Sequence, residues 1–254
     1  MTSVKLSVSI VSYHNFNDIK RLLESIKRNT SSELSMKIYV IDNANEQDQF
    51  RELVKQYPEL NYIHTGKNLG FGKGHNYVLS NLDSEYHAIV NPDVLLKDDA
   101  FSILIDFIEK TGCGMAVPKL VTPDGERLAA YRKDPNLLDM LCRIWFRSVF
   151  PEKVAVHELS HEDYSKPFKV PFAQGSFLVC KTDLFKQLNG FDESYFMYLE
   201  DADLCRRMNQ ISDVMYCPYT TVEHRWEKGS HKNFHLFRIH IQSWIKYFKK
   251  WGYF

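Results

Sequence analysis

Three carboxylates stand within four positions of the chain, at Glu200, Asp201 and Asp203. They directly follow the apolar run 196–199, and apolar residues then recur at helical spacing, which predicts that the acids lie at the start of a helix. The dipole of a helix N-terminus favours ionised carboxylates. The cluster therefore indicates either a carboxylate that projects into a cleft or an acidic first turn paired with the two arginines that follow it.

A further acid, Asp93, stands at the end of a predicted strand in the tripeptide Asn91-Pro92-Asp93. A carboxylate in that place can bind a Mg²⁺ or Mn²⁺ ion that carries a diphosphate. The tripeptide could also be a plain turn, since Asn-Pro favours turns. His224 follows another predicted strand and could complete a metal site, although a single histidine is usually not a ligand.

A glycine-rich loop contains Gly70, Gly72 and Gly74. The third glycine of a dinucleotide fingerprint would fall at position 75, which is His75, and Lys73 is not followed by the Ser or Thr of a phosphate-binding P-loop. The loop is therefore interpreted as a tight turn, either without a further role or one that lets the backbone approach a nucleotide.

The elements that would position these residues alternate between strand and helix over the first hundred residues, ending with a helix at 75–82 and a strand. This order is typical of a parallel, helix-covered sheet, in which ligands bind beyond the carboxyl ends of the strands. Tyr13, Asp42, the glycine loop and Asp93 fall at those ends, so this half is predicted to bind a nucleotide. The predicted strands are 6–11, 36–41, 62–64 and 86–90.

The second half of the chain is less regular. Residues 123–171 contain no readable motif and are expected to form a variable part that faces a partner. Alternating apolar residues predict strands at 174–180, 214–218 and 222–224.

The C-terminal segment 231–254 is basic and aromatic, and no acidic residue follows Glu227. Its apolar residues have helical spacing, which predicts an amphipathic helix with a basic opposite side. Such a helix either contacts an anionic membrane surface or packs on the domain, and Tyr247 and Trp251 are expected to remain exposed to lipid. The predicted apolar positions are Phe234, Phe237, Ile241, Trp244, Ile245 and Phe248, and the basic ones include Lys246, Lys249 and Lys250.

Composition narrows the class of protein. The 254 residues are 44% hydrophobic and 14% aromatic, which is enough for a large core, and the formal net charge of +0 argues against a general nucleic-acid binder. The five cysteines include no CxxC pair, which indicates reduced thiols in the cytoplasm. We see no signal peptide and no apolar run near the ~18 residues that span a bilayer. Nothing in the sequence indicates an oligomeric state.

Several short motifs occur together in a specific order. They are Ile10-Val11-Ser12-Tyr13, Ile41-Asp42-Asn43, Asn68-Leu69-Gly70-Phe71-Gly72, Asn91-Pro92-Asp93, Gly175-Ser176-Phe177, Gly190-Phe191-Asp192, Phe196-Met197-Tyr198, Glu200-Asp201, Asp203-Leu204 and His224. With these motifs, the chain resembles a family 2 glycosyltransferase of the GT-A fold over roughly 5–230. It is most similar to the bacterial rhamnosyltransferase-like branch of O-antigen and cell-surface polysaccharide assembly.

This resemblance implies an α/β fold with a Rossmann-like, mostly parallel central sheet flanked by helices. One domain, 1–230, would contain a nucleotide-binding half (1–100) and an acceptor-binding half (101–230). The basic helix of 231–254 would follow.

The resemblance also assigns roles to residues. Asp201 matches the family's general base, supported by Glu200, Asp203 and Arg207. Asp93 and His224 would hold Mg²⁺ or Mn²⁺, and Asn91 replaces the first acid of the family's DxD motif. The donor would be bound by Ser12, Tyr13, Asp42, Asn43, Asn68, Gly70, Phe71 and Asn91.

The implied activity is inverting, metal-dependent transfer of L-rhamnose from dTDP-L-rhamnose to a lipid-linked or growing saccharide. It would take place at the cytoplasmic face of the inner membrane, with peripheral membrane contact and no nucleic-acid partner. Other donors (UDP-galactose, UDP-galactofuranose or UDP-glucose) are alternatives. Two further alternatives are a nucleotidyltransferase, which should show a Gly-rich N-terminal loop with Lys or Arg, and a non-catalytic sugar-nucleotide-binding subunit.

Overall fold

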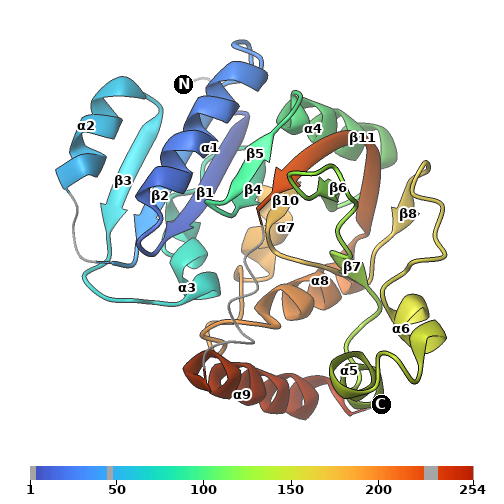
Figure 1. Cartoon of the computed structure of the whole chain (residues 1–254). Coiled ribbons are helices and arrows are strands. Elements are labelled where there is room, and N and C mark those ends of the chain that lie inside the picture. The colour runs from blue at the N-terminus through green and yellow to red at the C-terminus, as the bar shows by residue number, and fades with distance from the viewer. Residues whose placement is uncertain (1–3, 45–47, 226–233, 254) are drawn as a thin grey trace.

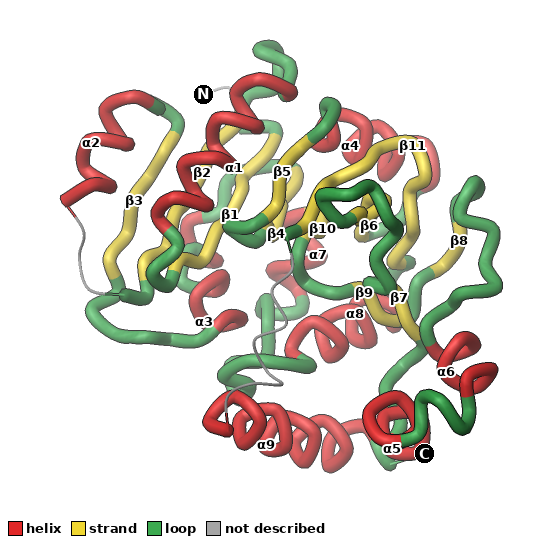
Figure 2. Tube along the Cα trace, viewed as in Figure 1, coloured by secondary structure: helices red, strands yellow, loops and turns green. Residues whose placement is uncertain are grey.

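The computed structural model describes residues 4–44, 48–225 and 234–253. Within these residues a nine-stranded sheet has the order β3-β2-β1-β4-β10-β6-β11-β5, with β8 paired to β11, and β7 and β9 form a separate ladder. Figure 1 labels these elements, and Figure 2 shows the strands gathered between helices. The strands are β1 (Leu6–Ser12), β2 (Met36–Asp42), β3 (Leu60–His64), β4 (Tyr86–Val90), β5 (Val94–Leu96), β6 (Met115–Val121), β7 (Tyr131–Arg132), β8 (Phe168–Lys169), β9 (Phe172–Ala173), β10 (Phe177–Lys181) and β11 (Val214–His224).

Helices connect and cover these strands. One predicted helix, 75–82, is wrong in its bounds: α3 begins four residues earlier, directly after Gly70, and a short 3₁₀ turn (Leu79–Asn81) takes the place of its second half. The helices are α1 (Phe16–Asn29), α2 (Asp48–Gln56), α3 (Phe71–Asn76), α4 (Ala100–Thr111), α5 (Leu137–Trp145), α6 (Pro151–His157), α7 (Thr182–Gln187), α8 (Glu200–Ile211) and α9 (Phe234–Trp251).

The N-terminal half confirms the predicted parallel arrangement. β1 pairs in parallel with both β2 and β4, and β2 pairs in parallel with β3. β1, β2 and β4 are largely buried, with Ser7, Ser9 and His87 among their apolar residues, because helices pack against the sheet. Parallel neighbours need a crossover connection such as α1. The carboxyl ends of these strands therefore share one edge, where ligands of α/β sheets bind.

The central sheet is mixed: parallel pairs predominate in the N-terminal half and recur between β6 and β11, and antiparallel pairs join them. β10 lies antiparallel between β4 and β6, and β11 is parallel to β6 but antiparallel to β5. Strand direction depends on long-range pairing, which residue alternation does not encode. The strands predicted at 214–218 and 222–224 are one strand, β11, whose register with β6 shifts between Tyr216 and Thr221. The tract 123–171, interpreted as irregular, contains α5, α6 and the short strands β7 and β8.

Two apolar clusters hold the molecule together. The larger one runs through the sheet of both predicted halves, from Leu6 to Val222. The smaller one joins α5, α8 and α9, and its members are Met140, Phe172, Tyr195, Leu199, Ala202, Trp244, Tyr247 and Phe248. In Figure 1, α9 accordingly lies beside α5 and close to α8. All five cysteines are free and buried.

The predicted amphipathic face of the C-terminal helix is partly wrong. Tyr247, expected to be exposed, is fully buried, because α9 packs Ser243, Trp244, Tyr247 and Phe248 inward. Phe234 is 84% exposed. Residues 231–233 and 254 of the predicted tail lie outside the described residues. Among the helices that the structure describes, none has both the length and the apolar character to cross a bilayer.

Candidate functional site

Several predicted donor-binding residues meet at the carboxyl edge of the parallel strands. Ser12 ends β1 and lies in register with Asp42, which ends β2. The amide of Asn43 donates to the Ser12 carbonyl at 2.8 Å, and the amide of Asn91, directly after β4, donates to the Ser176 carbonyl at 2.8 Å. The parallel pairing thus brings Ser12, Asp42 and Asn43 together, with Asn91 following the next strand.

Asp42 is buried and already hydrogen-bonded within the protein, whereas Tyr13 is exposed to a ligand. Asp42 is fully buried, and its two carboxylate oxygens accept hydrogen bonds from the Tyr62 hydroxyl (2.8 Å) and the Ala44 amide (3.0 Å). Asp42 therefore holds the turn after β2, and a base N–H would have to bond a remaining lone pair. Tyr13 is 52% exposed, which leaves a ring face open for stacking.

Three hydrogen bonds fix the glycine loop in place. The Asn68 side chain accepts from the Gly70 amide (2.9 Å), the Asn43 side chain donates to the Gly70 carbonyl (2.9 Å), and the Phe71 amide donates to the Phe196 carbonyl (3.0 Å). Gly70 has a φ of 82°, and a Cβ there would lie 2.1 Å from the Phe196 carbonyl oxygen. The close approach that requires glycine is thus to the chain segment before α8.

Gly70→Ala is expected to destabilise the protein more than Gly66→Ala. Gly66 also has a positive φ (72°), but a Cβ there meets nothing within 4 Å. Gly66→Ala incurs a positive-φ penalty of about 1–2 kcal/mol. Gly70 (φ 82°, ψ −170°) lies in a region nearly restricted to glycine, with a penalty of about 1–3 kcal/mol, and its Cβ adds steric overlap of about 1–3 kcal/mol. Denaturant unfolding measures the difference, and equal midpoints for the two variants would contradict the close approach.

The predicted acidic cluster does begin a helix, α8. Asp201 is half-buried, and its carboxylate accepts from the amides of Gly175 (3.0 Å) and Ala202 (2.9 Å). Burial raises the pKa of Asp201 above its usual value, while these two amides and the Arg132 charge oppose the rise. The ionised Asp201 side chain can therefore act as a base, and it binds a proton more tightly than an exposed aspartate does.

Glu200 and Asp203 have different surroundings from Asp201. Glu200 is buried, and one of its carboxyl oxygens has no hydrogen-bond partner within the described ranges; burial and the neighbouring Asp201 charge raise its pKa well above the usual range. Asp203 is fully buried and bonded to Arg207 (2.7 Å), the Trp251 indole (2.8 Å) and Lys250 (2.8 Å). Asp203 is thus fixed by three partners, whereas Glu200 is buried beside Asp201 with one carboxyl oxygen unbonded among the described residues.

Asp93 and His224 come together through the antiparallel pairing of β5 and β11, in which His224 lies opposite Val94. His224 Nε2 lies 3.3 Å from an Asp93 carboxylate oxygen. The His224 ring is 1% exposed, and neither of its nitrogens forms a hydrogen bond with a described residue. A buried imidazole without hydrogen bonds beside a carboxylate fits a divalent transition-metal ion. Across the described residues no group of three or more His, Cys, Asp and Glu gathers, so further ligands would come from elsewhere.

The loop that joins β9 to β10 contacts both the candidate base and the segment that carries the candidate metal ligand. The amide of Gly175 donates to Asp201, and the carbonyl of the next residue, Ser176, accepts from Asn91. Since Asn91 is two residues from Asp93, this contact places the base candidate and the metal candidate at the same edge of the sheet. The arrangement can combine deprotonation of a hydroxyl with neutralisation of a phosphate leaving group.

Three arginines near the site were not predicted. Arg21 and Arg225 line a small cleft with Asp93, and the Arg225 amide donates to the Asp93 carbonyl (3.1 Å). The positive charge of Arg132, in β7, lowers the pKa of Asp201 and so opposes the effect of burial. Arg225 could have been identified from the sequence, because it directly follows the candidate His224. Arg21 and Arg132 come close to the site through tertiary packing.

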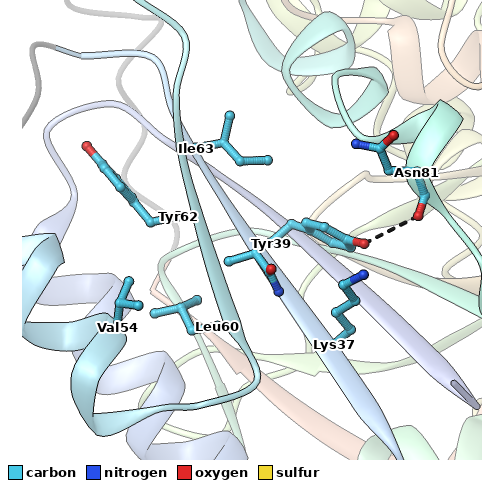
Figure 3. A pocket seen from close by; sticks show the side chains of 8 residues that line it. Lys37, Tyr39, Val54, Leu60, Tyr62, Ile63 and Asn81 are labelled. Atoms are coloured by element: carbon cyan, nitrogen blue, oxygen red, sulfur yellow. Dashed lines mark hydrogen bonds between the residues drawn. The ribbon is translucent and has the colours of Figure 1, made fainter.

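An open groove of about 680 Å³ lies away from these residues, along β2 and β3. Figure 3 shows its lining, where the Tyr39 hydroxyl donates to the Asn81 carbonyl. None of the predicted site residues lines this groove, so the candidate site remains at the carboxyl edge of the sheet.

Comparisons with known proteins agree with the motifs. A sequence profile described as glycosyl transferase family 2 matches residues 7–188. The chain is 28% identical to rhamnosyltransferase WbbL of Escherichia coli (strain K12), over 94% of this chain and 91% of that protein. It is also 28% identical to N-acetylglucosaminyl-diphospho-decaprenol L-rhamnosyltransferase of Mycobacterium tuberculosis (strain CDC 1551 / Oshkosh), over 96% of this chain and 84% of that protein.

Solved structures share the fold at low identity. A crystal structure of GalNAc-T7 with UDP, GalNAc and Mn²⁺ matches with a TM-score of 0.69 and 14% identity, over 98% of this chain and 48% of that one, so the chain spans about half of its length. The mannosyltransferase PcManGT from Pyrobaculum calidifontis, in complex with GDP-Man and Mn²⁺, matches with a TM-score of 0.67 and 15% identity, over 97% of this chain and 63% of that one. These neighbours agree with a GT-A-like α/β fold.

Proposed function

The chain belongs to glycosyl transferase family 2, as a hexosyltransferase, and from that premise we propose that it transfers L-rhamnose from dTDP-L-rhamnose to a lipid-linked or growing saccharide. Relatives named as rhamnosyltransferases over nearly the whole chain support this donor. The observation that carries the proposed chemistry is the Gly175-Ser176 connection, which contacts Asp201 on one side and Asn91 on the other.

The nucleotide is bound by the N-terminal half, 1–100, and the acceptor by the half 101–230. Tyr13 stacks on the base because its ring is exposed at the strand edge. Asp42 and Asn43 line the pocket at the end of β2, and the loop of Asn68, Gly70 and Phe71 forms its wall. Ser12 has a buried hydroxyl without a partner among the described residues, so it can bond the donor.

Asp93 and His224 would hold the divalent metal ion, and a nitrogen ligand would favour Mn²⁺ over Mg²⁺. When bound, this ion supplies positive charge that neutralises the departing nucleoside diphosphate. Arg21 and Arg225 line the cleft beside Asp93, where Arg21 is paired with Asp18 and Arg225 with Glu223.

Asp201 removes the proton from an acceptor hydroxyl as the oxygen attacks the anomeric carbon from the face opposite the nucleotide. The new C–O bond forms while the bond to the nucleoside diphosphate breaks, and Asp201 keeps the proton. A single displacement inverts the anomeric configuration. Glu200, Asp203 and Arg207 position α8 and do not react.

The donor assignment is tested by calorimetric titration with dTDP-rhamnose, UDP-galactose, UDP-glucose and GDP-mannose in the presence of Mn²⁺. We expect dTDP-rhamnose to bind at least tenfold more tightly than the others, with dTDP alone as the reference for the nucleotide. Tighter binding of a UDP-hexose would overturn the rhamnose assignment. Binding of a donor without turnover on any acceptor would favour the non-catalytic alternative.

We also place the protein at the cytoplasmic face of the inner membrane, through the outer side of α9. Phe234, Phe237 and Ile245 are exposed there by 84%, 43% and 47%, and Arg238 and Lys249 are exposed on the same helix. Exposed apolar and basic side chains on one helix suit an anionic lipid surface.

Replacing Phe234, Phe237 and Ile245 together by Ser is expected to reduce sedimentation with vesicles containing anionic lipid at least threefold. Tyr219→Ser, at another exposed site (64%), is the control. Equal sedimentation of the triple variant and wild type would refute this contact. Deletion of 231–254 is a poorer test, because it also removes the buried side chains of α9.

A further inference from the structure

We propose that the buried side of α9 is a positioning element for the base: it fixes the segment 194–199 and α8 so that Asp201 faces the acceptor. This inference rests on the proposed function, because it assumes that Asp201 reacts. It concerns the inward side of α9, opposite to the side proposed to contact lipid. Ser243 and Trp251 are its two main positioning residues.

The segment before α8 has a backbone that must be held in place. Tyr198 and Leu199 have φ values of 71° and 65°, in the left-handed region that residues other than glycine rarely adopt. Leu199 is the N-cap of α8, so its conformation sets the direction in which Glu200 and Asp201 leave the chain. Two consecutive residues in this region persist only where surrounding contacts impose them.

α9 supplies such contacts directly. The Ser243 hydroxyl donates to the Met197 carbonyl at 2.7 Å, and the His240 ring stacks on the Tyr198 ring with centroids 4.4 Å apart. Ser243 is 2% exposed, so water does not compete for this bond. Lys246 also donates to the Ser194 carbonyl.

α9 also contacts α8 itself at Asp203, two residues after the candidate base Asp201. The Trp251 indole N–H donates to Asp203 at 2.8 Å, and Lys250 lies 2.8 Å from the same carboxylate oxygen. Asp203 is fully buried, and its amide bonds the Leu199 carbonyl at 2.9 Å in the first turn. α9 therefore holds the chain on both sides of Asp201. The proposed donor-binding residues stand instead at the ends of β1, β2 and β4.

Ser243→Ala in the full-length protein tests this proposal against Ser25→Ala. Ser25 is also buried (8% exposed) and donates to a backbone carbonyl, that of Leu22; it lies in α1 and accepts a longer bond from the Leu96 amide (3.3 Å), away from α8 and α9. We expect Ser243→Ala to lower kcat at least tenfold with the Kd of the donor unchanged within twofold. We expect Ser25→Ala to leave kcat unchanged within twofold.

Amide hydrogen exchange of the peptide 196–203 provides a readout that does not depend on activity. Exchange there should be at least tenfold faster in Ser243→Ala than in Ser25→Ala or wild type. Trp251→Phe, which keeps a ring but removes the N–H donor to Asp203, should show the same two effects, and thermal melting verifies that each variant is folded.

Unchanged exchange of 196–203 in both Ser243→Ala and Trp251→Phe would overturn the positioning role, whatever the activity. So would a fall in kcat no larger than that of Ser25→Ala. Failure of the proposed function looks different: the wild-type protein would bind no nucleotide sugar, while the exchange result would still decide the role of α9.

Discussion

Asp201→Asn is expected to lower kcat about 10³-fold, within the range for loss of a general base. The donor should still bind with a Kd within twofold of wild type, because Asn retains an oxygen that can accept from the Gly175 amide and the fold around it is kept. Release of nucleoside diphosphate measures the rate, and calorimetry measures donor binding.

Asp213→Asn is the matched control, because the Asp213 side chain forms a surface ion pair with Lys169. It should transfer sugar at the wild-type rate. Full activity of Asp201→Asn would remove the base from the mechanism. Loss of donor binding in that variant would instead indicate a role in forming the nucleotide pocket.

The pH dependence of kcat should report the same carboxyl group. A base works only when deprotonated, so kcat falls as pH decreases through the pKa of Asp201, and burial places that pKa above its usual value of 3.8. The acid limb should therefore lie at a higher pH than for an exposed aspartate. The limb should be absent from the residual activity of Asp201→Asn.

Asp93→Asn is expected to lower kcat at least about 100-fold and to weaken Mn²⁺ binding about 10- to 100-fold, since a charged oxygen ligand is lost. His224→Ala should act in the same direction, with an added loss of stability because the buried ring leaves a cavity. Electron paramagnetic resonance of free Mn²⁺, with dTDP present, measures the binding without reference to activity.

His161→Ala serves as the control for histidine, because His161 is an exposed side chain paired with Glu152. It should bind Mn²⁺ as the wild type does. Unchanged Mn²⁺ affinity in both Asp93→Asn and His224→Ala would show that these two residues do not hold the metal.

Local sequence patterns were sufficient to predict the helices and strands whose formation depends on residues close together in the chain. The strands of the N-terminal half and the start of α8 at Glu200 follow from residue spacing, because alternation and helical periodicity report burial of one face. The motifs at Asp42 and Asp93 could be placed at one edge because the ends of parallel strands coincide, whereas Asp201, at a helix start, was linked to them only through the family resemblance.

Long-range contacts could not be predicted in this way. Nothing in the periodicity of α9 distinguishes a side that faces α8 from a side that faces lipid, so Tyr247 was expected on the wrong side. The pairing of β11 with β5, which brings His224 to Asp93, depends on strand direction and on a register shift. The close approach of Gly70 to the Phe196 carbonyl likewise joins segments far apart in the chain.

The anomeric configuration of the first product tests the single displacement at Asp201 most directly. The protein, dTDP-rhamnose, Mn²⁺ and a lipid-linked saccharide acceptor are combined, and the new linkage is examined by proton NMR. We predict a linkage with the opposite configuration to the donor and no such product from Asp201→Asn. A product with the configuration of the donor would contradict it, because retention requires two displacements.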